Sequence, residues 1–162
     1  MELAPETLEQ NGTVYLVRCV LKRDRRMKWG KDPISSSHEA LKFVNFIRKA
    51  DREHMVTICL STKNYPIAYS VTAIGTGNTA YVRPGELYRV PLLAGATAVI
   101  VAHNHPSGDP RPSQQDRDFT QRLSDAAKLL GLRLVDHLIV GPENRYHSFS
   151  DYGEMPSGEN SI

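Results

Sequence analysis

The feature of this 162-residue chain that most constrains its fold is a nearly unbroken apolar run, ATAVIVA, over residues 96–102. A short run of this kind is typical of a strand that is covered on both faces of a sheet. Gly95 precedes the run and His103 follows it, so the predicted strand ends next to chemically active side chains. Because a chain of this length normally forms a single compact domain, we expect one domain built around this central strand.

The remaining elements follow from the spacing of apolar residues and from turn signals. A polar interval ending in Pro66 separates two apolar segments, which predicts an antiparallel hairpin. The segments that predict strands are residues 14–21, 55–60, 67–74, 96–102, 132–140 and 146–149. Helical spacing and helix-start signals predict helices over 37–50, 84–95 and 113–131. This order of elements indicates a three-layer α/β domain with a mixed β-sheet flanked by helices.

Two short flanking segments, 1–12 and 151–162, are expected to be mobile on either side of a domain at 13–150. The first of them carries three glutamates and no basic residue, whereas a secretory leader begins basic and continues apolar. We therefore expect a cytoplasmic protein. The longest apolar stretch, residues 90–102, is shorter than the ~20 residues that a membrane-spanning helix needs, so no membrane partner is expected.

The charge of the chain gives only a weak indication of a nucleic-acid partner. A formal net charge of +2 is too small to imply one. Residues 22–31 hold six basic residues and one acidic residue around Trp29, a composition that suits phosphate contacts and base stacking. We favour the simpler interpretation of a solvated loop, because phosphate binding usually recruits a more extended basic surface.

Two histidines and an aspartate form the strongest chemical pattern in the sequence. His103 and His105 are one residue apart at the end of the predicted central strand, so their side chains point to the same side. Asp116 follows in the first turn of the next predicted helix, after a loop with three prolines and one glycine that limits its conformational freedom. Two imidazoles and one carboxylate leave a fourth position open for water, as a catalytic zinc site requires.

Each part of this pattern also has a simpler explanation. Ser113 and Asp116 fit a helix capping box, and an isolated His-x-His pair is often a coincidence. The joint pattern H-x-H-x7-S-x-x-D favours a metal site over these alternatives. A metal-dependent hydrolase also needs a carboxylate to accept a proton, and spacing alone does not choose among Glu39, Glu53 and Glu86.

The segment HNHPSGDPRPSQQD closely resembles the metal motif of JAMM (JAB/MPN+) metalloproteases, specifically of their bacterial RadC branch. The segments ADREHMVTICLSTKN and LGLRLVDHLIVG extend the resemblance over about residues 14–149. The resemblance implies a cytidine-deaminase-like fold, one zinc ion, and hydrolysis of peptide or isopeptide bonds in a peptide or protein substrate. It selects Glu53 as the proton acceptor and implies that Ser113 stabilises the oxyanion.

Three further polar residues are expected to support the site rather than to react. Asn104 lies between the two histidines and should point away from them, and Asp136 and His137 lie within a later strand. The competing hypothesis is a non-catalytic zinc-containing module of RadC type that binds DNA or protein. An open coordination position, together with Glu53 and Ser113, favours the enzyme.

Overall fold

The computed structural model describes residues 16, 18–22, 24, 27–75 and 82–156. Within them, five strands form one sheet in the order β2-β1-β3-β4-β5. Strands β3 and β4 pair in parallel, whereas the other neighbouring pairs are antiparallel. The strands are β1 (His54–Leu60), β2 (Pro66–Ile74), β3 (Ala98–Asn104), β4 (Arg133–Val140) and β5 (Tyr146–Ser148). The prediction of a mixed sheet is therefore confirmed.

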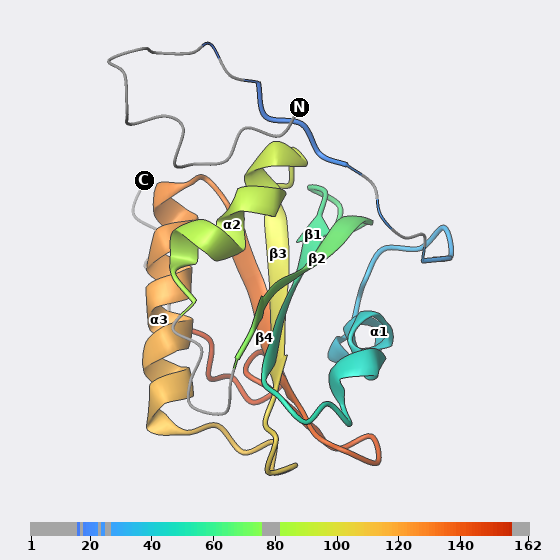
Figure 1. The fold of residues 1–162 in the computed structure, drawn as a ribbon, viewed down its shortest axis with the longest axis vertical. Coiled ribbons are helices and arrows are strands. Elements are labelled where there is room, and N and C mark those ends of the chain that lie inside the picture. The colour runs from blue at the N-terminus through green and yellow to red at the C-terminus, as the bar shows by residue number, and fades with distance from the viewer. Residues whose placement is uncertain (1–15, 17, 23, 25–26, 76–81, 157–162) are drawn as a thin grey trace.

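Helical segments cover both faces of this sheet, which gives the three layers visible in Figure 1. The helices α2 (Pro84–Leu93) and α3 (Gln114–Leu129) lie on one face. The other face is covered by α1 (Ser37–Ala40) and by the 3-10 turns η2 (Leu41–Phe43) and η3 (Asn45–Ile47). The predicted α/β class and its three-layer arrangement are thus confirmed.

The central strand β3 is buried along its whole length. Its even-numbered residues from Ala98 to Ala102 pack in the apolar layer beneath α1. Val99 and Val101 pack instead against the layer of α2 and α3, because successive side chains of a strand point to opposite faces. Burying such a side chain stabilises the fold by roughly 1.5–3 kcal/mol, which holds the end of β3 in a fixed position.

Helix α3 connects the parallel strands β3 and β4. Ser113 caps its first turn, and Gly131, with a φ of 68°, follows its last turn. The backbone N–H of Leu132 then donates to the carbonyl of Ala127 at 2.8 Å, a chain reversal that glycine permits because it lacks a Cβ. Because α3 begins after the loop that follows β3, its first turn lies beside the end of β3.

The predicted strand at 14–21 is wrong for the residues that the structure describes. Residues 16 and 18–21 have no regular secondary structure and are exposed, and residues 14, 15 and 17 lie outside the described part. β-Branched residues form a strand only where a partner offers backbone hydrogen bonds and cover for their side chains. The expected mobile segment 1–12 also lies outside the described residues.

The helix predicted over 37–50 is broken into shorter turns. The backbone of Val44 has φ −121° and ψ 7°, which lies outside the helical region, and its N–H donates to Leu41, three residues back. The buried residues nevertheless recur at helical spacing (Ala40, Phe43, Val44 and Ile47). The apolar pattern therefore predicted the buried face but not the winding of the backbone.

The segment expected to begin a mobile tail at Asp151 instead folds back onto the domain through residue 156. The Glu154 N–H donates to the carbonyl of Phe149 at 2.7 Å. Its carboxylate forms an ion pair with Arg117 on α3 at 2.7 Å and contacts His147 at 3.0 Å. The boundary at 151 is too early, because the ion pair that holds this segment on α3 comes from Arg117, which is 37 residues away in sequence. Residues 157–162 lie outside the described part.

The aromatic residue of the basic run belongs to the apolar layer beneath α1. The Trp29 ring lies 4.7 Å from that of Phe43, centroid to centroid, and its Nε1 donates to the carbonyl of Asp32 at 2.8 Å. Lys42 lies over its ring at 5.5 Å. Packing of this kind favours the interpretation of residues 22–31 as a loop, of which 23, 25 and 26 lie outside the described part.

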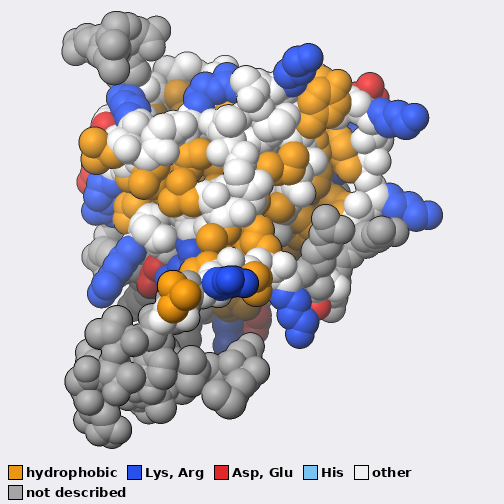
Figure 2. Space-filling view, turned by 90° about the horizontal axis from the view of Figure 1, so that it is seen from above, with side chains coloured by type: hydrophobic (Ala, Val, Ile, Leu, Met, Phe, Trp, Pro, Cys, Tyr) orange, Lys and Arg blue, Asp and Glu red, His pale blue; other side chains and the backbone are white. Residues whose placement is uncertain are grey.

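The end of the molecule at which α2 and α3 finish is partly apolar. Figure 2 views this end from above and shows hydrophobic side chains across its surface, with lysines and arginines towards the edges. Leu92, Leu93, Leu129 and Leu130 are exposed near the last turns of these helices. No helix in the described ranges has the length and apolarity to cross a bilayer. The carboxyl end of β3 lies at the opposite end of the molecule.

Candidate metal centre

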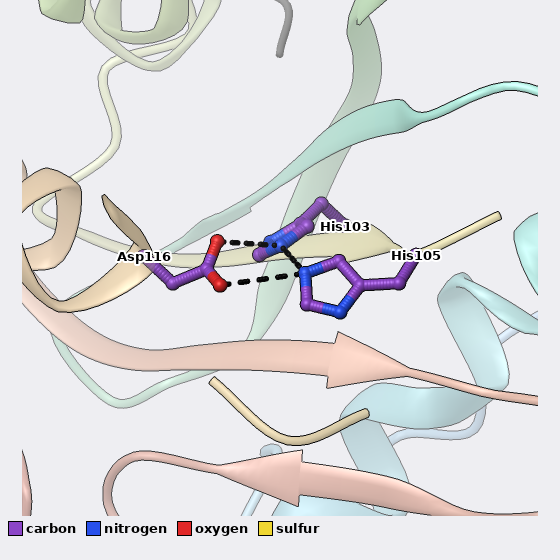
Figure 3. A group of neighbouring side chains, drawn as sticks. All are labelled: His103, His105 and Asp116. Carbon is purple, nitrogen blue, oxygen red and sulfur yellow. Dashed lines mark hydrogen bonds and ion pairs between the residues drawn. The ribbon is translucent and has the colours of Figure 1, made fainter. Parts of the chain in front are cut away.

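His103, His105 and Asp116 converge where β3 ends and α3 begins (Figure 3). The Nε2 atoms of His103 and His105 are 3.0 Å apart. Asp116 Oδ1 lies 3.1 Å from Nε2 of His103, and Asp116 Oδ2 lies 3.4 Å from Nε2 of His105. The His103 side chain is 1% exposed, whereas those of His105 and Asp116 are 21% and 14% exposed. The structure therefore brings the three predicted residues together into a group that could hold a metal ion.

The loop after β3 fixes the orientation of the His105 ring. His105 Nδ1 lies 2.7 Å from the carbonyl oxygen of Asp109. Because a carbonyl only accepts, this nitrogen carries the proton, and Nε2 of the neutral ring keeps a lone pair that is available to a metal ion. In the protonated ring Nε2–H donates to Asp116, and this hydrogen bond raises the pKa of His105; burial opposes this, while the Asp109 carbonyl and the charges of Asp116 and Glu53 add to it.

Asp116 is held as a carboxylate by the groups around it. Burial alone would raise its pKa, but hydrogen bonds from the protonated rings of His103 and His105 and from Ser113, together with the charge of a protonated His103, lower it well below its usual range. The Ser113 hydroxyl donates to Asp116 Oδ2 at 2.5 Å, and the Ser113 N–H donates to the same oxygen at 2.7 Å. Asp116 N–H in turn donates to Ser113 Oγ at 3.2 Å.

These contacts form the capping box that was the simpler explanation of Ser113 and Asp116. The two explanations are compatible, because the cap uses Asp116 Oδ2 while Oδ1 faces His103. The capping box therefore fixes the carboxylate in the position from which it meets both histidines.

Glu53 precedes β1 and is partly exposed. Its carbonyl accepts from the N–H of Gly75 at 2.8 Å, which fixes its backbone. The Asn104 side chain holds both neighbours of Glu53: it accepts from His54 N–H at 2.8 Å and donates to the carbonyl of Arg52 at 3.0 Å. Asn104 thus points away from the histidines into supporting contacts, as predicted, and it positions the segment that carries Glu53.

The other two candidate glutamates have different local partners. Glu86 is exposed in the first turn of α2, where its carboxylate accepts from the N–H of Arg83 at 3.3 Å. Glu39 belongs to α1, on the other face of the sheet, and accepts from the N–H of Ser35 at 2.7 Å. Of the three, only Glu53 is among the charges that raise the pKa of His105.

A buried chain of polar contacts extends behind His103. His137 Nε2 lies 2.9 Å from His103 Nδ1, and His137 Nδ1 lies 2.7 Å from the hydroxyl of Thr120. Burial, followed by the charge of His103, lowers the pKa of His137 well below its ordinary value. A supporting role for His137 was expected, whereas Thr120 was missed. Its signal in the sequence was its position four residues after Asp116, on the same side of α3.

Comparison with known proteins gives a consistent family assignment. A family model described as the RadC-like JAB domain matches residues 34–154. A UPF0758 protein of Desulfitobacterium hafniense is 43% identical over 107 residues, which cover 66% of this chain and 47% of that protein. A UPF0758 protein of Thermotoga maritima is 40% identical over 124 residues, which cover 76% of this chain and 55% of that protein. The chain spans about half the length of these relatives.

Proposed function

Because the chain belongs to the RadC-like JAB domain family, we propose that it is a zinc-dependent metallohydrolase that cleaves peptide or isopeptide bonds. The observation that carries this proposal is the convergence of His103, His105 and Asp116 at one end of the sheet. Zinc in proteins is bound by imidazole nitrogen and carboxylate oxygen at about 2.0–2.2 Å. Tetrahedral bonds of that length would separate neighbouring donors by roughly 3.3–3.6 Å, within a few tenths of an ångström of the 3.0, 3.1 and 3.4 Å between donor atoms here.

The three side chains would hold the ion, and a bound zinc supplies Lewis acidity that polarises a carbonyl and acidifies a water molecule. The donor set leaves one position of a tetrahedron for substrate or water, as catalytic sites do. The peptide or protein substrate would then present its scissile carbonyl beside the partly exposed His105 and Asp116, because His103 is closed off from solvent.

Glu53 is proposed to accept at its carboxylate a proton from the water molecule that adds to the scissile carbonyl carbon, and to return that proton to the leaving amine as the C–N bond breaks. Its partial exposure keeps it accessible to substrate, and its contribution to the pKa of His105 supports its nearness to the donor set. The backbone contacts of Asn104 on both sides of Glu53 limit the movement of this segment. A general base held in this way contributes about 10²–10⁴-fold to a rate.

Ser113 is proposed to stabilise negative charge on the substrate carbonyl oxygen. Its hydroxyl is exposed and lies beside the proposed ligand carboxylate, to which it donates in this structure. To act on the substrate, the hydroxyl exchanges Asp116 Oδ2 for the developing oxyanion. The Ser113 N–H still donates to Asp116 Oδ2 after this exchange, so that the carboxylate keeps one of its two contacts with the cap.

The function is tested with Glu53→Gln and the matched variant Glu86→Gln, each loaded with zinc and assayed against a library of peptides and lysine isopeptides. Glutamine keeps the shape of the side chain but cannot accept the proton. We expect Glu53→Gln to retain zinc and to lose about 10²–10⁴-fold in hydrolysis. Glu86→Gln should stay close to wild type, because Glu86 only caps a helix.

Full activity of Glu53→Gln would remove Glu53 from the mechanism. A zinc-loaded wild-type protein that hydrolyses none of the library would overturn the enzymatic proposal. That second result would favour a non-catalytic zinc-containing module that binds DNA or protein.

A further inference from the structure

The buried hydrogen bonds behind His103 determine which atom of each contact carries the proton. Thr120 Oγ1 and the carbonyl oxygen of Asp116 are 2.6 Å apart, a separation that requires a hydrogen atom between the two oxygens. Since a carbonyl only accepts, the Thr120 hydroxyl is the donor. This is the bond that a threonine in a helix commonly makes to the carbonyl four residues back.

The single proton of the Thr120 hydroxyl is thus used in the bond to the Asp116 carbonyl, so the hydroxyl can only accept a hydrogen bond from His137. The 2.7 Å contact between Thr120 Oγ1 and His137 Nδ1 therefore places a proton on that nitrogen. His137 is 0% exposed and stacks on Phe149, with ring centroids 5.1 Å apart. Its hydrogen-bond partners within the described residues are a hydroxyl and another imidazole, surroundings that favour a neutral ring.

A neutral His137 with its proton on Nδ1 has a bare Nε2. That atom lies 2.9 Å from His103 Nδ1, so the proton between the two rings belongs to His103. The Nε2 lone pair of a neutral His103 is then available to a metal ion that His105 Nε2, 3.0 Å away, and Asp116 Oδ1, 3.1 Å away, would share. The Nε2 atom of a neutral His105 is also unprotonated, because the proton of that ring lies on Nδ1, which donates to the Asp109 carbonyl.

We propose that Thr120 and His137 are positioning residues that set the tautomer of His103, so that its Nε2 lone pair is directed at the metal. The inference rests on the proposed function for the identity of the ion, but the order of protons follows from the contacts of Thr120 and His137 alone. Metal-binding histidines generally donate their second N–H to an oxygen acceptor. Here the acceptor is a second imidazole, that of His137. The position of its proton is set by Thr120 on α3, the helix that also carries Asp116.

The opposite polarity makes a distinct prediction. If His137 carried its proton on Nε2, it would donate to His103 Nδ1 and move the proton of His103 to Nε2. A protonated Nε2 cannot ligate a metal. Removal of the Thr120 hydroxyl removes the acceptor for His137 Nδ1–H, and so allows this opposite order of protons.

The first measurement is the tautomer of His137 in the metal-free full chain, from long-range ¹H–¹⁵N spectra of the imidazole nitrogens, with His137→Gln to assign the signals. We expect a protonated Nδ1 and a bare Nε2. A bare Nδ1 in the wild-type protein would overturn the proposal. This measurement needs neither bound metal nor activity, so failure of the zinc hydrolase proposal would leave its result valid.

The second measurement is zinc affinity by chelator competition for Thr120→Val, which keeps the shape of threonine, and Thr120→Ser, which keeps the hydroxyl. We expect about 10–100-fold weaker binding for valine, the range known for residues that support metal ligands, and recovery with serine. Ser124→Ala, one turn further along the buried side of α3, should bind zinc like wild type. Equal affinity of wild type and Thr120→Val would contradict the proposal, and if the valine variant does not fold, the wild-type tautomer decides.

Discussion

Along β3, Ala98, Ile100 and Ala102 pack into the apolar layer beneath α1, whereas Val99 and Val101 pack against α2 and α3. At the end of the strand, Asn104 is the next residue on the face towards α1, and His103 is the next residue on the face towards α2 and α3. The Asn104 side chain forms hydrogen bonds with backbone groups on either side of Glu53. The His103 side chain has its polar contacts with His137 and with the side chains of the candidate centre.

The difference between these faces comes from the twofold alternation of a strand. Two adjacent residues are both about 1% exposed, yet one holds backbone while the other presents a ring nitrogen to a metal centre. Both polar side chains are buried with partners, as burial of polar groups requires. The rigid end of a single strand thus positions the ligand and the segment of the proposed base together.

The largest expected effect on stability comes from the apolar face. Ile100 is 2% exposed and packs on the side away from the candidate centre. Ile100→Ala should lower the free energy of unfolding by about 2–5 kcal/mol, because it removes buried methyl groups and leaves a cavity. Urea unfolding measures this loss, and zinc affinity per folded molecule should stay within a small factor of wild type. A large fall in affinity would show that the two faces are not independent.

Asp136 and His137 extend the comparison to β4, where adjacent residues again point to opposite faces. Burial raises the pKa of Asp136 from 3.8 to about 6, although hydrogen bonds from Ser148, Ser150 and His137 oppose the shift. Because the folded protein binds this proton more tightly than the unfolded chain does, stability should fall as the pH rises from about 4 to about 6. The difference between a pKa of 3.8 and one of about 6 corresponds to about 3 kcal/mol at neutral pH.

Asp136→Asn should remove this dependence. An asparagine oxygen can still accept from the backbone N–H groups of His137 and Ser150, and its amide can donate to Ser148 Oγ. Urea unfolding of the metal-free proteins should show the variant more stable than wild type above about pH 6 and the difference closing towards about pH 4. A difference that stays constant over this range would contradict the raised pKa.

A smaller loss of stability is expected at Asn104. Asn104→Ala leaves the His54 N–H and the Arg52 carbonyl without their partner, which should cost about 1–3 kcal/mol. The segment that carries Glu53 should also move more freely, and misplacement of a catalytic group by about 1 Å can lower a rate about 10²-fold. We expect zinc to be retained while hydrolysis by the folded protein falls. Normal hydrolysis by the folded variant would separate Asn104 from the positioning of Glu53.

The sequence predicted those parts of the fold in which the local pattern and the tertiary structure agree. β1, β2, β3 and α3 carry strong apolar periodicity and clear start or stop residues, and all four form close to their expected bounds. The strand predicted over 14–21 had suitable residues, but those that the structure describes are exposed. Val44 interrupts the helix predicted over 37–50. The sequence did not predict this interruption, because the spacing of buried residues alone does not distinguish an α-helix from successive 3-10 turns.

The candidate site was predictable to a similar degree. His103, His105 and Asp116 lie close in sequence, and strand and helix geometry alone brings them together. Thr120 was missed because its importance depends on the contact with His137, which comes from a different strand. The Asp109 carbonyl, which orients His105, is a backbone group and leaves no signal in the residue type.

The most direct test of the account is the metal content of the full chain, purified after growth with ample zinc, for wild type, Asp116→Ala and Asp118→Ala. Asp118 is an exposed carboxylate two residues further along α3 and serves as the matched control. We predict about one zinc per chain for wild type and Asp118→Ala, and almost none for Asp116→Ala, since one of three protein ligands is gone. Zinc-free wild-type protein, or equal zinc in wild type and Asp116→Ala, would contradict a metal centre at the end of β3.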